Sequence, residues 1–185
     1  MRTNSGNQET QFFVVRQLRP SEKDLFRDHL LRLDRESRTD RFNGGTKDDF
    51  LIAYADRSFS DGTSVIGVVE DGEVIGAAEL HEKPEPDGEP TAEIAFSVEK
   101  QWQHRGLGGL LFERLIQTAI GLGYRRLRVT THAQNAAMKA LARRFGAKLT
   151  FEFGETVGLI ELEDAVHMAL PVHARTDFWH QREQH

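Results

Sequence analysis

Three glycines fall within four residues, at positions 106, 108 and 109, directly before a long amphipathic segment. The stretch Gln103–Gly109 (QHRGLGG) therefore offers consecutive backbone N–H groups, with little side-chain bulk, at the start of an expected helix. Such N–H groups and the positive end of the helix dipole bind anions. This spacing predicts a site for a phosphate group.

Two common phosphate motifs do not fit this stretch. A P-loop requires Gly-Lys-Ser/Thr, which the sequence lacks. A dinucleotide fingerprint requires a tight turn after the strand and a small residue at its sixth position. Here seven residues separate Val98 from Gly106, and Leu111 stands at the sixth position. A nucleotide-linked oxidoreductase is therefore a weak alternative.

A carboxylate precedes the glycines on the expected strand Thr91–Val98. Side chains alternate between the faces of a strand, so Glu93 shares a face with Ala95 and Ser97. Small neighbours leave room for a substrate, and partial burial would raise the pKa of a carboxyl group toward the range of a general base. The alternative is a solvent-facing glutamate on a half-exposed strand.

The N-terminal half is expected to supply strands of the sheet that positions these residues. Helical spacing of Leu25, Phe26, Leu30 and Leu33 predicts a first helix, and the segment Arg41–Gly45 is a polar break after it. Asp71-Gly72 predicts a two-residue hairpin turn. The expected elements are a strand at 12–19, a helix that opens at Pro20-Ser21, a second helix at 47–57, and hairpin strands at 64–70 and 73–80.

The C-terminal half continues with strands and helices in alternation. Leu107, Leu111 and Leu115 belong to one apolar stripe of a helix that ends at Gly121-Leu-Gly123. The expected elements are a strand at 91–98, a helix from 107 to about 122, a strand at 125–130, a helix at 134–145, and strands near 148–153 and 157–170. This order predicts an α/β or α+β domain with a mixed sheet.

Length and composition favour one domain. The 185 residues divide into a polar leader at 1–10, a domain at 11–171 and a C-terminal tail at 172–185. A net charge of -5 with scattered Lys and Arg argues against a nucleic-acid binder. With no apolar run near the roughly 20 residues that span a bilayer, we expect no membrane partner and a cytoplasmic location. The sequence leaves open whether the chain forms a homodimer.

The pattern Gln103-x-x-Gly106-x-Gly108 after a strand resembles the acetyl-CoA signature of the GCN5-related N-acetyltransferase (GNAT) superfamily. Asn135 opens a helix that ends at Phe145-Gly146, and this feature also resembles the family. The resemblance covers about residues 12–170 and implies a GNAT acyl-CoA N-acyltransferase fold. That fold has a twisted, mostly antiparallel mixed sheet of about seven strands flanked by about four helices.

What the resemblance implies for the donor is binding of acetyl-CoA as a co-substrate. The backbone of strand 91–98 would pair with the pantetheine arm, and the glycine loop would hold the pyrophosphate. The residues implied are Phe96, Val98, Gln103, His104, Arg105, Gly106, Leu107, Gly108, Gly109 and Asn135. The eight histidines show no paired ligand spacing, so no metal is predicted.

The resemblance also implies transfer of an acetyl group to an amine, with Glu93 as the base. The sequence has no cysteine, which excludes a cysteinyl acyl-enzyme and favours direct attack in a ternary complex. Many family members carry a tyrosine seven residues after the asparagine that protonates the leaving thiolate. Ala142 stands there, so no general acid is assigned. A non-catalytic acyl-CoA sensor is the alternative.

The acceptor is expected to be a small amine or a protein lysine. Ser37, Arg41 and Phe42 resemble a segment of bacterial protein-lysine acetyltransferases, in a region that borders the family's acceptor site. Arg41 and Phe42 are therefore candidate substrate-binding residues. The alternative is a loop between helices that is held by salt bridges.

Overall fold

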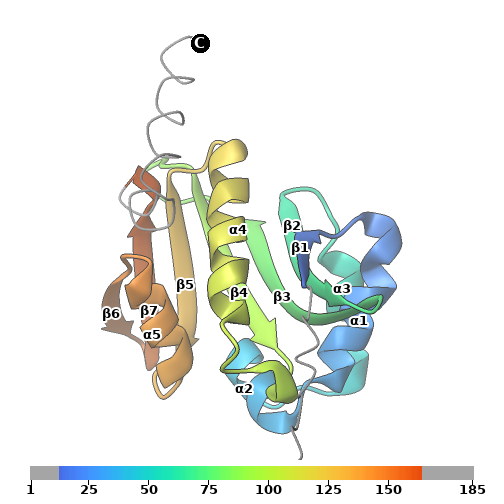
Figure 1. Ribbon diagram of the computed structural model, residues 1–185. Coiled ribbons are helices and arrows are strands. Elements are labelled where there is room, and N and C mark those ends of the chain that lie inside the picture. The colour runs from blue at the N-terminus through green and yellow to red at the C-terminus, as the bar shows by residue number, and fades with distance from the viewer. Residues whose placement is uncertain (1–12, 164–185) are drawn as a thin grey trace, which may run out of the picture.

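A single seven-stranded sheet organises the chain (Figure 1). The computed structural model describes residues 13–163, so the expected leader, the tail and the end of the last expected strand lie outside the described residues. The strands are β1 (Val14–Gln17), β2 (Thr63–Glu70), β3 (Glu73–Glu82), β4 (Thr91–Val98), β5 (Arg126–His132), β6 (Lys148–Glu152) and β7 (Glu155–Glu161). The helices are α1 (Lys23–Arg32), α2 (Arg35–Phe42), α3 (Asp48–Arg57), α4 (Leu107–Gly121) and α5 (Ala136–Arg144), with short 3₁₀ turns η1 (Pro20–Glu22) and η2 (Lys100–Trp102).

The strand order β1-β2-β3-β4-β5-β7-β6 confirms the predicted mixed sheet. Neighbouring strands are antiparallel except β4 and β5, which run parallel. Asp71 and Gly72 have φ angles of 48° and 82°, as the predicted hairpin turn between β2 and β3 requires. The strand at 91–98 has the bounds that its alternation predicted.

Helix α2 was not predicted, so three helices follow β1 instead of two. Its sequence (RESRTDRF) is polar and offers almost no apolar stripe. Local capping replaces that stripe: the Asp34 carboxylate accepts from the Ser37 N–H, and the helix stops where Asn43 adopts φ 54°. Of the predicted break at Arg41–Gly45, the first two residues belong to this helix, and the rest lies in the loop that leads to α3.

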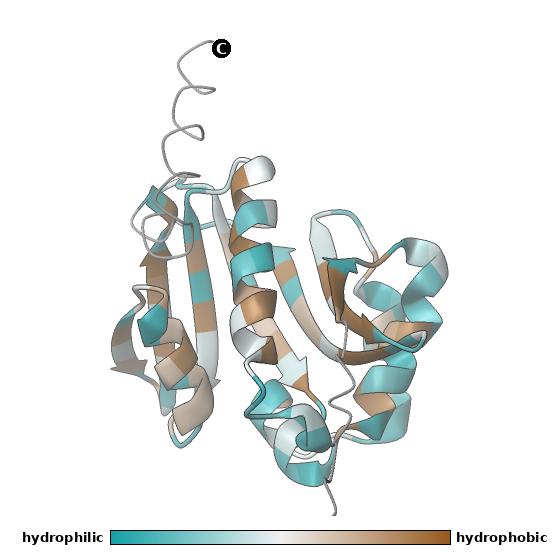
Figure 2. Cartoon of the chain, viewed as in Figure 1, coloured by the Kyte–Doolittle hydropathy of each residue, from teal (hydrophilic) through white to brown (hydrophobic). Residues whose placement is uncertain are grey.

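Two apolar clusters cover the two faces of the sheet. On one face α4 and α5 bury a cluster that includes Leu111, Phe112 and Phe145. On the other face α1 and α3 bury a cluster that includes Phe26, Leu30 and Leu51. Figure 2 shows the matching alternation of hydrophobic and hydrophilic bands along β5 and around α4. In residues 13–163, no helix is both long and apolar enough to cross a membrane.

The parallel pair β4 and β5 separates along its length. Their register runs from Thr91 opposite Arg126 to Ile94 opposite Val129 and goes no further, although both strands continue. The final residues of β4 and β5 therefore border an opening in the middle of the sheet. The glycine loop follows β4 at this opening, and Glu93 lies one residue before the last pair, Ile94 and Val129.

Candidate active site

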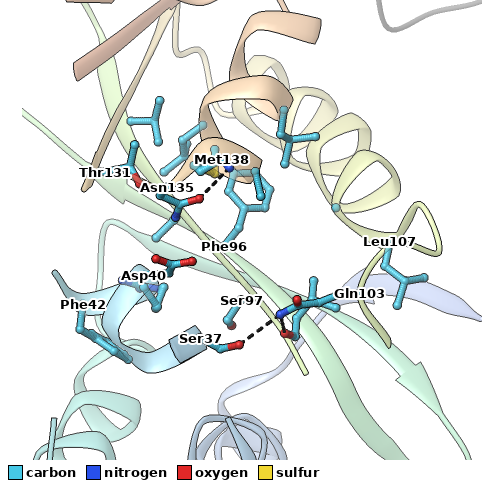
Figure 3. Close-up of a pocket in the computed structure, with 18 of the residues that line it drawn as sticks. Ser37, Asp40, Phe42, Phe96, Ser97, Gln103, Leu107, Thr131, Asn135 and Met138 are labelled. Carbon is cyan, nitrogen blue, oxygen red and sulfur yellow. Dashed lines mark hydrogen bonds between the residues drawn. The ribbon is translucent and has the colours of Figure 1, made fainter. Parts of the chain in front are cut away.

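A cavity of about 870 Å³ occupies the opening between β4 and β5. Its walls come from β4, β5, the glycine loop, the start of α5, and α2 with the end of β3. Figure 3 shows side chains from these elements pointing into one space, among them Asp40, Phe96, Ser97 and Asn135. A volume of this size suits an organic ligand rather than a single ion.

The glycine loop closes one side of the cavity, at the N-terminus of α4. Gly106 has φ 83°, a conformation that L side chains rarely adopt, and the space around its missing Cβ is open. The amides of Gly109 and Leu110 donate to the Gly106 carbonyl. The amides before Gly109 in this first turn have no carbonyl acceptor within the helix. The loop can therefore present N–H groups to an anion.

Packing explains the other two glycines of the loop. A Cβ on Gly108 would come within 3.3 Å of the Leu141 side chain, and one on Gly109 within 3.1 Å of the Arg144 guanidinium. These glycines let α5 approach the loop, which brings Arg144 to the cavity wall. Arg144 could not be selected from the sequence, since nothing in its local pattern sets it apart from Arg143.

Gln103 holds the loop in place through its side chain. Its Nε2 donates to the Val98 carbonyl at 3.0 Å and to the Ser37 hydroxyl at 3.1 Å, which ties the loop to both β4 and α2 (Figure 3). Arg105 does not line the cavity. Its guanidinium lies 4.7 Å from the centre of the Trp102 ring.

Polar groups of β5 and α5 face the cavity from the opposite side. Asn135 caps α5, because its Oδ1 accepts from the Met138 N–H at 2.8 Å. Thr131 is buried, and its hydroxyl makes no hydrogen bond within residues 13–163. A buried polar group without a partner is costly, so a ligand that bonds this hydroxyl would remove a penalty.

Glu93 lines the cavity on β4 and is about one-third exposed. One carboxylate oxygen accepts from the Thr130 hydroxyl at 3.1 Å, and the other lies 3.2 Å from Lys83 Nζ. Glu93 therefore has hydrogen-bond partners in the folded chain and also faces the cavity. His81 stands directly opposite it on β3 and lines the same cavity.

A buried polar network supports this end of the cavity. Glu79 is 1% exposed, and its carboxylate accepts from Arg41 at 2.5 Å and from the Tyr54 hydroxyl at 2.7 Å. His81 Nε2 lies 3.2 Å from the same carboxylate. Burial alone would raise the pKa of Glu79, but Arg41 and His81 outweigh burial and hold the pKa at about 2. Glu79 is therefore ionised.

Tyr54 also belongs to this buried network, and the sequence did not identify it as a site residue. Its hydroxyl donates to Glu79 and accepts from Arg41 Nη2 at 2.6 Å. Burial, and then the negative charge of Glu79, raise the pKa of Tyr54. No local pattern could have found this network, because its members come from α2, α3 and β3.

The cavity gathers most of the residues that the sequence selected. Those in its lining are Arg41, Phe42, Glu93, Phe96, Val98, Gln103, His104, Gly106, Leu107, Gly108, Gly109 and Asn135. Asp40 joins them from α2; burial, followed by the nearby charge of Glu36, raises the pKa of its carboxyl group. Within the described residues, no cluster of three or more His, Cys, Asp or Glu side chains could hold a metal ion.

The chain matches one protein-family model, described as the acetyltransferase (GNAT) family, over residues 27–147. The match begins within α1 and ends just after α5. It includes β4, the glycine loop and both sides of the cavity.

Solved structures share the fold. The GNAT domain of PAT from S. lividans superposes with a TM-score of 0.70 at 19% identity, covering 82% of this chain and 96% of that one. Two others have TM-scores of 0.60. Phosphinothricin acetyltransferase from Sinorhizobium meliloti, in complex with acetyl-CoA, is 14% identical, with coverages of 80% and 88%. The PaiA N-acetyltransferase from Thermoplasma acidophilum, in complex with coenzyme A, is 15% identical, with coverages of 81% and 99%.

Proposed function

Because the chain belongs to the GNAT acetyltransferase family and is an acyltransferase, we propose that it transfers an acetyl group from acetyl-CoA to a primary amine, on a small molecule or a protein lysine. The observation that carries this proposal is one continuous cavity. It joins the amides at the start of α4, which suit a pyrophosphate, to the carboxylate of Glu93, which suits a base.

The proposal that acetyl-CoA is the donor rests on the residues that line the cavity near the glycine loop. The loop from Gln103 to Gly109 binds the pyrophosphate through backbone amides. The pantetheine arm lies along β4, where the backbone of Phe96 and Val98 has lost β5 as a partner beyond Ile94. The hydroxyl of Thr131 faces this arm from β5 and bonds one of its amide groups. Arg144 adds positive charge beside the phosphates.

The part of the cavity around Glu93, which we call the acceptor half, is where we place the amine. Its chemistry depends on Glu93. An amine with a pKa of about 10.4 must lose a proton before it can attack, at a cost of roughly 4.6 kcal/mol at pH 7. Glu93 takes that proton, and the neutral amine attacks the thioester carbon in a ternary complex. The N–C bond forms, the attacking nitrogen passes its extra proton to water, the C–S bond breaks, and the backbone amide of Val98 stabilises the oxyanion of the intermediate.

The leaving thiolate collects its proton from water. Ala142 is buried in the core cluster of α5 and cannot supply one. Tyr54 lines the cavity, but its proton is held by ionised Glu79 and its pKa is raised. A thiol is acidic enough, with a reference pKa near 8.5, to leave as the anion.

Negative charge around the acceptor half favours a cationic substrate. Asp40 and Glu93 line this half of the cavity, with Glu36 near Asp40, and Lys83 lies 3.2 Å from Glu93 and offsets part of its charge. Arg41 lies in the same wall, but its charge is neutralised by Glu79. An ammonium group is therefore attracted to the cavity before Glu93 deprotonates it.

The test is release of free CoA thiol from acetyl-CoA across a panel of small amines and lysine peptides, with the products identified by mass spectrometry. We expect thiol release that depends on the amine and equals the N-acetylated product. Ala142 is the one observation that favours a sensor. Tight CoA binding without turnover on any amine would establish that function instead.

A further inference from the structure

A serine, a histidine and a glutamate form a hydrogen-bonded chain behind the wall of the cavity. Ser97 on β4 lines the cavity, and its Oγ lies 2.9 Å from His29 Nε2 on α1. His29 Nδ1 lies 3.2 Å from a carboxylate oxygen of Glu99. The three residues are 6%, 0% and 3% exposed, so the group is almost closed to solvent.

The charge of Glu99 fixes the direction of the hydrogen bonds. Burial alone would raise the pKa of Glu99, but hydrogen bonds from His29 and Arg32 outweigh it and lower the pKa. Arg32 Nε donates to the same oxygen at 3.0 Å, and Gln101 donates to the other at 2.8 Å. The carboxylate carries no proton, so His29 Nδ1 must donate to it.

This bond determines the tautomer of His29. Burial lowers the pKa of the imidazole more than Glu99 raises it, so the ring is neutral. A neutral ring that donates through Nδ1 has a lone pair on Nε2. The Ser97 hydroxyl therefore donates to His29, and its oxygen lone pairs are left for the cavity.

We propose that Ser97 is a nucleophile that takes the acetyl group from acetyl-CoA when no amine occupies the acceptor site. This inference rests on the proposed function, because it requires acetyl-CoA in the cavity. The roles follow from geometry: a nucleophile bonded to a base, and a base held in one tautomer by a carboxylate.

The step balances with the groups present. Ser97 Oγ attacks the thioester carbon while its proton passes to His29 Nε2. The C–S bond then breaks, and His29 returns the proton to the departing sulfur. The products are O-acetyl-Ser97 and free CoA thiol, and water entering the cavity hydrolyses the ester slowly. A bound amine competes with Ser97 for the same thioester carbon, so we expect the acetyl-serine to build up only when no amine is present.

Position on β4 supports this assignment. Ser97 lies between Phe96 and Val98, the two residues whose backbone is proposed to hold the pantetheine arm. Ser37 also lines the cavity, but its hydroxyl accepts from Gln103 and has no histidine beside it in the described chain. Ser97 alone among the lining serines described has an activating base.

The experiment incubates the full chain with acetyl-CoA and no amine, and follows intact mass and a peptide map over time. We expect one added acetyl group on the peptide that contains Ser97. Ser97→Ala should lose this label, whereas Ser97→Cys should keep it in a form that neutral hydroxylamine removes. Ser64→Ala, which alters a buried serine of β2 outside the cavity lining, should label like the wild type.

Glu99→Gln tests the histidine and its carboxylate, and we expect labelling to slow by on the order of 10²-fold. Calorimetry with CoA separates this inference from the proposed function. If CoA does not bind, the proposed function fails. If CoA binds and wild-type Ser97 stays unlabelled, or if Glu99→Gln labels at the wild-type rate, the nucleophile assignment is wrong.

Discussion

Arg41 of α2 reaches Glu79 of β3, and its Nη2 lies 2.5 Å from the carboxylate in a site where both side chains are buried. This contact fastens the unpredicted helix α2 to the sheet at the cavity wall. Arg41 also lies 4.6 Å from the centre of the Phe42 ring and bonds Tyr54. The pair therefore positions the side of the cavity that we assign to the acceptor.

Removing Arg41 should destabilise the fold severely. Arg41→Ala leaves the charge of Glu79 buried without its main partner, and such changes typically cost about 3–5 kcal/mol. Urea unfolding at pH 7 measures the loss. Lys23→Ala is the matched control, because Lys23 pairs with Asp56 at the exposed surface and should have a far smaller effect. Equal losses in the two variants would refute a structural role for the buried pair.

Gly106 and Gly72 separate backbone strain from ligand binding. Their φ angles are 83° and 82°, and neither has an atom within 4 Å of an added Cβ. Replacement by Ala should therefore cost each variant a similar stability, about 1–2 kcal/mol. Only Gly106→Ala should weaken CoA binding, because only Gly106 belongs to the loop at the cavity. Calorimetry that finds equal CoA affinity in both variants would count against the pyrophosphate assignment.

The unpartnered hydroxyl of Thr131 makes a second prediction about the donor. Thr131→Val removes a buried group that has no hydrogen bond in the described chain, so stability should stay the same or rise. CoA affinity should fall about fivefold, the equivalent of one hydrogen bond of about 1 kcal/mol. Thr91→Val is the opposite control, because Thr91 donates to the Glu89 carbonyl and lies outside the cavity. It should lose stability and keep its CoA affinity.

The base assignment predicts a particular dependence on pH. Glu93→Gln should slow acetyl transfer by on the order of 10²-fold or more at pH 7, because the amine stays protonated. The defect should shrink as pH rises toward the pKa of the amine, where a base is no longer needed. Glu152→Gln, an exposed change on β6, serves as control. Unchanged rates for Glu93→Gln at every pH would eliminate Glu93 as the base.

Local sequence patterns predicted the elements that carry the donor site. Alternation along 91–98 set the bounds of β4, Asp71-Gly72 set the hairpin, and the glycines with the apolar stripe set the start of α4. Each of these signals lies within a few residues of the structure that it specifies. The order of the strands and helices along the chain then predicted a mixed sheet.

A weak local signal and long-range contacts account for what the sequence did not reveal. Helix α2 was missed because capping by Asp34 and burial of Ser37 hold it, while its apolar stripe is weak. The groups around Glu79 and around His29 were missed because their members are distant in sequence. His29 and Ser97 are 68 residues apart, and only the packing of α1 on the sheet brings them together.

The distances between bound CoA, the glycine loop and Glu93 test the account most directly. A crystal structure of the chain with CoA would measure them. We expect pyrophosphate oxygens within about 3.2 Å of backbone amides between Gln103 and Gly109. We also expect the thiol to end beside β4, in the part of the cavity that Glu93 and Ser97 line. A pyrophosphate held away from this loop, or a thiol directed away from Glu93, would contradict the account.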